Sequence, residues 1–278
     1  MKTVQNLLLL TDFSEISENA AQYALRLSKT LKADVDLLHI INTPVNWSKL
    51  PLEKEKFYPE VKAEIGSAKA SLSALSMTFL KQGTKAVESL VFNEGVENIP
   101  RYINEEKYDL IIMGSHGSKG FKEAVIGSNA QKILRQIKTP ILVVKTAPKT
   151  KSFSKIVMAS TFEENQKSYF KQLYSYATDF KISINLLYIN TPFNFKETIE
   201  INQMLNSFGE ECSNNTCDKY YVDALNEERG IHYFMNTSDA DLFAIATSEK
   251  SKLSRLFSPS LTEAIINHLH IPVLVFHI

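Results

Sequence analysis

The residues of this chain best suited to chemistry lie in a glycine-rich stretch, residues 114–128, with the spacing Gly114-x2-Gly117-x9-Gly127-Ser128. A short apolar run, residues 108–113, precedes it, and an apolar pattern of helical spacing, residues 130–137, follows it. Backbone N–H groups in such a loop and at the start of the next helix can bind an anion such as phosphate. Glycine loops are more often simple turns, so the loop alone is a weak indication of phosphate binding.

Short apolar runs alternate with amphipathic helical patterns around this stretch. The alternation predicts strands at residues 5–10, 35–41, 87–92, 108–113 and 140–145, and helices at residues 14–31, 49–82, 96–104 and 130–137. It therefore predicts an α/β fold with a doubly wound, mainly parallel sheet, which binds ligands at the carboxyl ends of its strands where the strand order reverses. If the first and fourth strands are neighbours there, Asp12 faces the same crevice as the glycine loop.

The pattern then starts again after a polar link at residues 147–152. Residues 155–160, 186–192, 220–225, 241–246 and 271–276 correspond to the five strands of the first half, and residues 165–180 to its first helix. The aromatic residues of that helix are expected to form core and inter-domain contacts. The sequence thus predicts a tandem repeat of one α/β unit, with domains at residues 1–147 and 152–278.

A five-stranded unit with a G-2x-G-9x-G-[ST] loop after its fourth strand resembles the universal stress protein family, with its adenine nucleotide alpha hydrolase-like fold. The first half carries this signature in full, and its Thr11-Asp12-Phe13-Ser14 and Leu38-His39-Ile40 segments are also similar to the family. The resemblance covers the whole chain as two such domains.

The resemblance implies that the first half binds ATP or another adenine nucleotide, with or without magnesium. Asp12 and the backbone of Ile40 are expected on the adenine side, and the glycines and Ser128 beside the ribose and phosphates. The nucleotide-binding residues implied in this way are Thr11, Asp12, Ile40, Gly114, Gly117, Gly127 and Ser128.

The second half departs from the signature. An alignment with one deletion in the loop puts Thr247 in place of Gly114, Lys250 in place of Gly117, and Pro259-Ser260 in place of Gly127-Ser128, while Thr161 replaces Asp12. A non-glycine residue in a left-handed conformation costs roughly 1–2 kcal/mol, and proline has no N–H to donate to a phosphate. The second half is therefore expected not to bind ATP in this mode and to act as a structural partner of the first.

No catalytic or metal-binding residue is assigned. A Walker-type lysine would follow the glycine loop, whereas Gly127 is followed by Ser128 and Asn129, and the motifs of adenylyl-transfer enzymes are absent. His116 has the simpler role of a solvent-facing loop residue, and Asp12 that of a nucleotide contact rather than a magnesium ligand. An ATP-binding stress-response or signalling protein is the expected function. A slow ATP hydrolase and a non-nucleotide interaction protein are the alternatives.

The amino-acid composition limits which binding partners and which cellular location are expected. Basic and acidic residues are equal, 31 of each, so neither nucleic acid nor a membrane surface is an expected partner. No apolar segment approaches the roughly 20 residues of a membrane helix. Cys212 and Cys217 are interpreted as free thiols, which favours a cytoplasmic protein. Beyond the nucleotide and the pairing of the two domains, an unknown protein partner and a homodimer, paired through residues 141–144 and 273–276, are left open.

Overall fold

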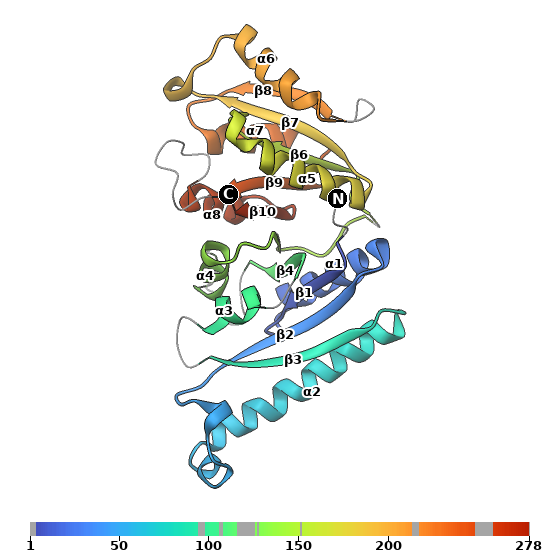
Figure 1. The fold of residues 1–278 in the computed structure, drawn as a ribbon, viewed down its shortest axis with the longest axis vertical. Helices are drawn as coiled ribbons and strands as arrows, with labels where there is room; N and C mark the ends of the chain where they lie inside the picture. The colour runs from blue at the N-terminus through green and yellow to red at the C-terminus, as the bar shows by residue number, and fades with distance from the viewer. Residues whose placement is uncertain are drawn as a thin grey trace.

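The computed structural model describes residues 4–93, 98–105, 108–115, 126, 128–150, 152–212, 217–247 and 258–277 (Figure 1). The first half contains β1 (Asn6–Leu10), α1 (Glu15–Leu31), β2 (Asp34–Asn42), α2 (Pro59–Lys81), β3 (Ala86–Asn93), α3 (Asn98–Glu105), β4 (Leu110–Gly114), α4 (Ser128–Gln136) and β5 (Ile141–Val144). The second half contains β6 (Lys155–Ala159), α5 (Lys167–Phe180), β7 (Ser183–Asn190), α6 (Thr198–Gly209), β8 (Cys217–Asp223), α7 (Glu227–Thr237), β9 (Leu242–Thr247), α8 (Pro259–His268) and β10 (Val273–His277).

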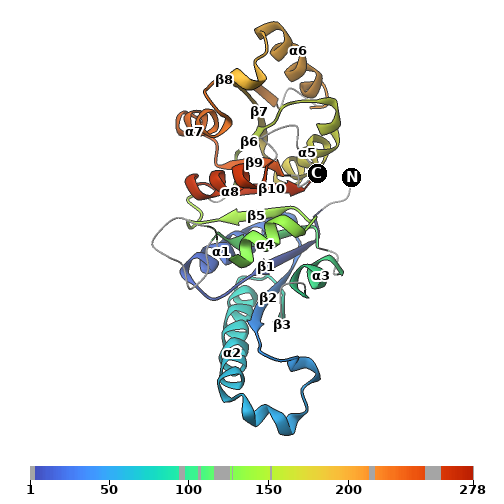
Figure 2. The same ribbon diagram turned by 90° about the vertical axis from the view of Figure 1, so that its left-hand side faces the viewer.

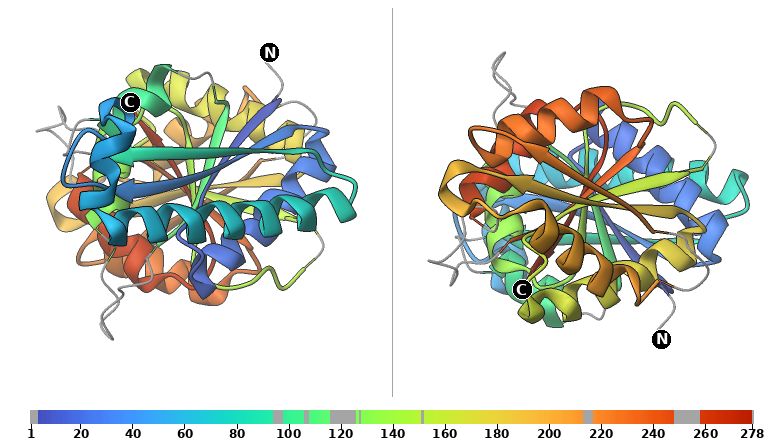
Figure 3. Two further views of the ribbon diagram at one scale, coloured as in Figure 1. Left: turned by 90° about the horizontal axis from the view of Figure 1, so that it is seen from below. Right: turned by 90° about the horizontal axis from the view of Figure 1, so that it is seen from above.

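The strands form one ten-stranded sheet in the order β3-β2-β1-β4-β5-β10-β9-β6-β7-β8. The β5–β10 pair is antiparallel, with Val273 opposite Val143, and the other eight pairs are parallel. Helices lie on both sides of the strands (Figure 3). The prediction of a mainly parallel, doubly wound α/β fold is confirmed.

The strand order reverses between β1 and β4. The chain runs outward from β1 through β2 to β3, and then returns to β4 on the other side of β1. Helices α1 and α2 pack on one face of this half of the sheet. Because parallel crossovers are right-handed, α3 and α4, which connect strands in the opposite direction, belong to the other face. This reversal creates the point at which doubly wound sheets bind ligands.

Strand β1 is the central strand of the first half, and both of its faces are covered. Its sequence is NLLLL, and the side chains of Leu7, Leu8 and Leu9 are fully buried. Such continuous apolar runs are typical of parallel strands buried on both sides. Helix α1 begins after Ser14, whose hydroxyl accepts a hydrogen bond from the Ser17 amide as an N-cap. The helix expected from residue 14 thus begins at this cap.

The two halves repeat the same backbone features 149 residues apart. Phe13 and Phe162 both have positive φ angles, as do Lys32 and Lys181 at the ends of α1 and α5. The amides of Thr11 and Ser160 donate to the carbonyl groups of Leu38 and Leu187, respectively. These correspondences fix which residues of the two halves are equivalent.

The two halves meet along β5 and β10, with α4 and α8 beside them (Figure 2). The Arg135 guanidinium of α4 lies 2.8 Å from the Glu263 carboxylate of α8, and the Tyr176 hydroxyl of α5 donates to the carbonyl group of Asp109. Tyr169, also on α5, is 1% exposed. The expectation that this aromatic helix supplies core and contacts between the halves is confirmed.

Three expectations are wrong. Cys212 and Cys217 are joined by a disulfide, with their Cα atoms 6.2 Å apart, so they are not free thiols and give no support to a cytoplasmic location. Strands β5 and β10 pair with each other, so they are not edges open to another chain. The helix expected from residue 49 begins only at Pro59, after short 3-10 helices at Trp47–Lys49 and Leu52–Phe57. Pro51 interrupts the helical pattern because it lacks an N–H.

In addition to the helix expected at residues 165–180, helices α6, α7 and α8 follow β7, β8 and β9 in the second half. They complete the unit that the predicted repeat implies. Within the part of the chain that the structure describes, none of the helices combines the length and the apolar character that a membrane span requires.

Candidate functional site

The turn that follows β1 is held by its own side chains. The Thr11 hydroxyl accepts a hydrogen bond from the Phe13 amide (3.1 Å). One Asp12 carboxylate oxygen accepts from both the Ser14 amide (3.1 Å) and the Ser14 hydroxyl (2.7 Å). These bonds order the turn that connects β1 to the first turn of α1, and they fix where the Asp12 side chain lies.

Phe13 and His39 complete this turn, a role that residue spacing alone did not indicate for either. Phe13 has a φ angle of 62°, a conformation that is costly for a bulky residue and is tolerated where the surroundings impose it. Its ring lies 4.6 Å from the His39 imidazole. His39 Nδ1 lies 2.7 Å from the Thr11 carbonyl oxygen; since a carbonyl group only accepts, Nδ1 carries the proton.

Strand β4 brings Gly114 to the same edge of the sheet. The last residue pair between β1 and β4 is Leu10 with Met113, so Thr11 and Gly114 each lie one residue beyond it. The next residue, Ser115, is fully buried, and its amide donates to the Val144 carbonyl (3.0 Å). The expectation that the first and fourth strands are neighbours at the switch point is confirmed.

Ile40 borders the same edge from the other side of β1. The last pair between β1 and β2 is Leu10 with Leu38, so Ile40 stands two residues further along β2, where it pairs with Val91 of β3. Helix α4 begins at Ser128. Gly117, His116 and Gly127 lie outside the described residues. The structure therefore brings Thr11, Asp12, Ile40 and Gly114 to one edge, the carboxyl end of the sheet.

The strand pairs show that the expected alignment of the second half with the glycine loop of the first half is wrong. Gly114 pairs with Val144 at the end of β4, and the pair 132 residues later is Ala246 with Phe276, which precedes the last pair of β9, Thr247 with His277. The same spacing of 132 residues relates the bonds from Ile111 to Pro140 and from Phe243 to Pro272. Ala246, not Thr247, therefore takes the place of Gly114, and no deletion is needed.

With this spacing, Glu249 rather than Lys250 aligns with Gly117, although it lies outside the described residues. Pro259 still aligns with Gly127 and stands in the first turn of α8, where it offers no N–H. The loss of the signature in the second half therefore remains after the correction.

In the second half, several carboxylates lie near the residue that is equivalent to His39. The equivalent residue is Tyr188, whose hydroxyl donates to the Asn194 carbonyl (2.8 Å). Burial raises the pKa of Tyr188 to about 12, and the carboxylates of Glu200, Glu163 and Glu227 act in the same direction. Glu227 is itself 8% exposed. This edge of the second half is therefore acidic, which opposes the binding of a polyphosphate.

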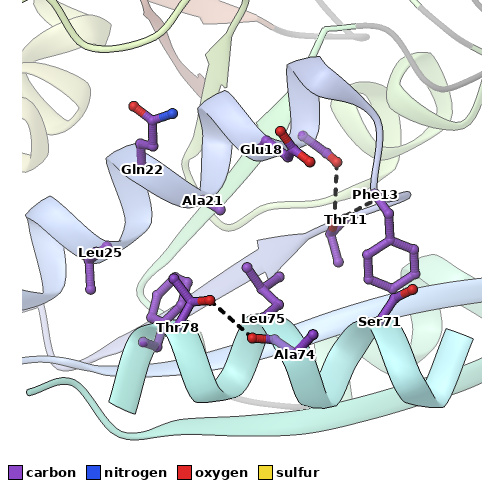
Figure 4. Close-up of a pocket in the computed structure, with 12 residues that line it drawn as sticks. Thr11, Phe13, Glu18, Ala21, Gln22, Leu25, Ser71, Ala74, Leu75 and Thr78 are labelled. Carbon is purple, nitrogen blue, oxygen red and sulfur yellow. Dashed lines mark hydrogen bonds between the residues drawn. The ribbon is translucent and has the colours of Figure 1, made fainter. Parts of the chain in front are cut away.

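A groove opens beside the first-half site, between α1 and α2 (Figure 4). Its volume is about 440 Å³, and its apolar lining comprises Phe13, Ala21, Leu25, Ala74, Leu75 and Phe79. Thr11 also borders it, so the turn after β1 separates this α1–α2 groove from the carboxyl edge of the sheet. Residue spacing did not indicate the groove, since small residues on a helix face are usual in a packed core.

The described residues contain no group of three or more His, Cys, Asp or Glu side chains arranged to hold a metal ion. His268, the last residue of α8, contacts Glu228 of α7, with 2.9 Å between His268 Nδ1 and the carboxylate.

In sequence, the chain is similar to known proteins over about half of its length. The model of the universal stress protein family matches residues 3–145. Universal stress protein MJ0577 of Methanocaldococcus jannaschii is 31% identical over 154 residues, which cover 51% of this chain and 94% of that protein. Universal stress protein YxiE of Bacillus subtilis is 28% identical over 146 residues, covering 50% and 97%, respectively.

Similarity over the full length comes from structure. A universal stress protein from Archaeoglobus fulgidus DSM 4304 has a TM-score of 0.74 and 19% identity, and the match covers 98% of this chain and 96% of that one. At this identity the match shows the fold alone. Since the family model matches more than half of the chain, the protein belongs to the universal stress protein family.

Proposed function

We propose that this protein is an ATP-binding stress-response protein in which the first half binds one adenine nucleotide and the second half is its structural partner. In this proposal the domains are residues 1–147 and 152–278. The observation that carries it is the meeting of Thr11, Asp12 and Gly114 at the switch point between β1 and β4, the place where doubly wound sheets bind nucleotides.

The chemistry of the first-half edge supports a phosphate-bearing ligand. Gly114 ends β4, and α4 begins at Ser128, at the end of the glycine signature. The N-terminus of α4 favours negative charge because its first N–H groups have no partner within the helix. Thr11 and Asp12, in the turn after β1, and Ile40 of β2 would contact the adenine and ribose, and magnesium would accompany the phosphates.

The second-half edge supports a structural role. Pro259 removes a backbone donor at the helix start, and carboxylates surround Tyr188. Micromolar binding corresponds to only about 8 kcal/mol, so the loss of a few contacts to the phosphates abolishes it. The second half instead covers the β5 edge and supplies the aromatic residues of α5 to the contact between the halves.

A matched pair of double variants tests the proposal. Gly127→Val with Ser128→Val alters the loop end of the first half, and Pro259→Val with Ser260→Val alters the equivalent positions of the second. Equilibrium dialysis with ATP and magnesium should show binding lost in the first variant and kept in the second. Binding that survives the first variant would overturn the proposal. Phosphate release in the same samples measures hydrolysis, which is expected to be slow.

A further inference from the structure

The α1–α2 groove is open in the first half, whereas the equivalent space of the second half is filled. Ala21 of α1 lines the groove, and the residue 149 positions later is Phe170 of α5, which is fully buried. The Phe170 ring lies 5.6 Å from that of Phe208 on α6. The same fold thus packs this space when an aromatic residue is present.

The turn residues show the same contrast. Phe162, the equivalent of Phe13, is 3% exposed, and its ring lies 5.2 Å from that of Phe208. Phe13 is only half-buried and lines the open groove. Protein interiors are close-packed, and an apolar void forfeits contacts that its lining atoms would otherwise make. The first half therefore keeps an open space, at some cost in packing, although aromatic side chains fill the equivalent space of the second half.

The lining of the groove indicates the chemistry of a ligand. The floor is apolar, with Ala21, Leu25, Leu75 and Phe79. Hydroxyl and amide side chains, among them those of Ser71, Thr78 and Gln22, stand along the rim (Figure 4). Among the described residues that line the groove, the one charged side chain is the carboxylate of Glu18. An apolar floor with a few polar groups at its border is typical of small-molecule sites, and about 440 Å³ lies within their usual range.

We propose that the α1–α2 groove binds a small, uncharged amphipathic molecule, with its apolar body on Leu75 and Phe79 and its polar group at the rim. The Glu18 carboxylate disfavours anionic amphiphiles such as fatty acids. Because Thr11 and Phe13 belong both to this groove and to the turn at the carboxyl edge, a bound molecule contacts that turn from the side of the helices.

Nile red, an uncharged dye, tests the proposal by fluorescence titration in the absence of nucleotide, so the result does not depend on the ATP site. The wild-type protein is expected to bind the dye saturably. Ala21→Phe, which installs the residue of the second half, should weaken binding roughly tenfold or more because the ring occupies the apolar volume. Ala74→Phe fills the groove from the exposed side of α2, and keeps the test valid if Ala21→Phe does not fold.

Controls separate the groove from general surface binding. Ala63→Phe makes the same change on an exposed part of α2 outside the groove and should leave the dye affinity unchanged. At low salt, decanol should displace the dye more effectively than decanoate, and Glu18→Gln should reduce that difference. Absence of saturable dye binding in the wild type would overturn the proposal, as would wild-type affinity in folded Ala21→Phe and Ala74→Phe proteins.

Discussion

His39 Nδ1 donates a hydrogen bond to the Thr11 carbonyl oxygen at 2.7 Å and so ties the ends of β2 and β1 together. The equivalent Tyr188 makes no such tie and donates instead to the Asn194 carbonyl. The difference matters because Thr11 begins the turn that carries Asp12, the residue proposed to contact the nucleotide. The geometry of the first-half edge thus depends on a residue from the neighbouring strand.

Replacing His39 should therefore affect both stability and binding. His39→Phe keeps the ring contact with Phe13 but removes the hydrogen bond, at a cost of roughly 0.5–1.5 kcal/mol in the free energy of unfolding. ATP affinity should fall because the turn is less well held. Chemical denaturation and ATP titration measure the two effects. Tyr188→Phe is the matched control, since it removes the equivalent residue's bond and should lower stability without changing affinity.

The contact between the halves should contribute measurably to stability. Tyr176→Phe removes a buried hydroxyl that bonds to the Asp109 carbonyl, and the free energy of unfolding should fall by about 1 kcal/mol. Tyr233→Phe, at a side chain 63% exposed, should have no measurable effect. Equal stability of the two variants in urea would contradict a structural role for the Tyr176 bond.

The disulfide between Cys212 and Cys217 should stabilise the region between α6 and β8. For such a short loop, the chain-entropy relation predicts a loss of about 2 kcal/mol on reduction. Denaturation with and without reductant measures this loss, and a protein with both cysteines changed to serine shows whether reductant acts elsewhere. ATP binding should be unchanged, because β8 is the outer strand of the second half. Two reactive thiols in the native, unreduced protein would show that the pairing is wrong.

Acidification should destabilise the packing of α7 against α8. Burial lowers the pKa of His232, and His268 and His270 lower it further, while Glu228 opposes them. The unfolded chain therefore binds a proton on His232 at a higher pH than the folded chain does, so stability is lost as the pH falls below about 6.5. Thermal unfolding at pH 7.5 and 5.5 should show a smaller decrease in His232→Gln than in the wild type. An equal decrease would exclude His232 as a contributor.

The alternation of apolar runs and helical patterns was enough to predict the fold, because buried parallel strands such as β1 are continuous apolar segments with clear ends. It could not predict that β5 and β10 would join the two halves into one sheet. The apolar sequences of both strands indicate only that they are buried. Which strand pairs with an apolar edge strand depends on tertiary packing. The disulfide was missed for a similar reason, since two cysteines five residues apart can pair or stay free.

The site was predictable where it depends on chain order and unpredictable where it depends on side-chain contacts. Asp12 and Gly114 follow directly from strands that must be neighbours at a switch point. His39 acts across strands, and its contact with Thr11 requires the register of Leu38 with Leu10. The alignment of Thr247 with Gly114 was wrong because the second half has no glycine there to mark the equivalent position. The residue pairs between neighbouring strands do mark it.

The most direct test of the account is the number of ATP molecules bound per chain. Calorimetric titration of ATP with magnesium into nucleotide-free wild-type protein should give one site for each chain, because the second half has Pro259 in place of Gly127 and carboxylates around Tyr188. Two sites would contradict the proposal that the second half does not bind ATP. No binding by the folded protein would contradict the nucleotide site itself.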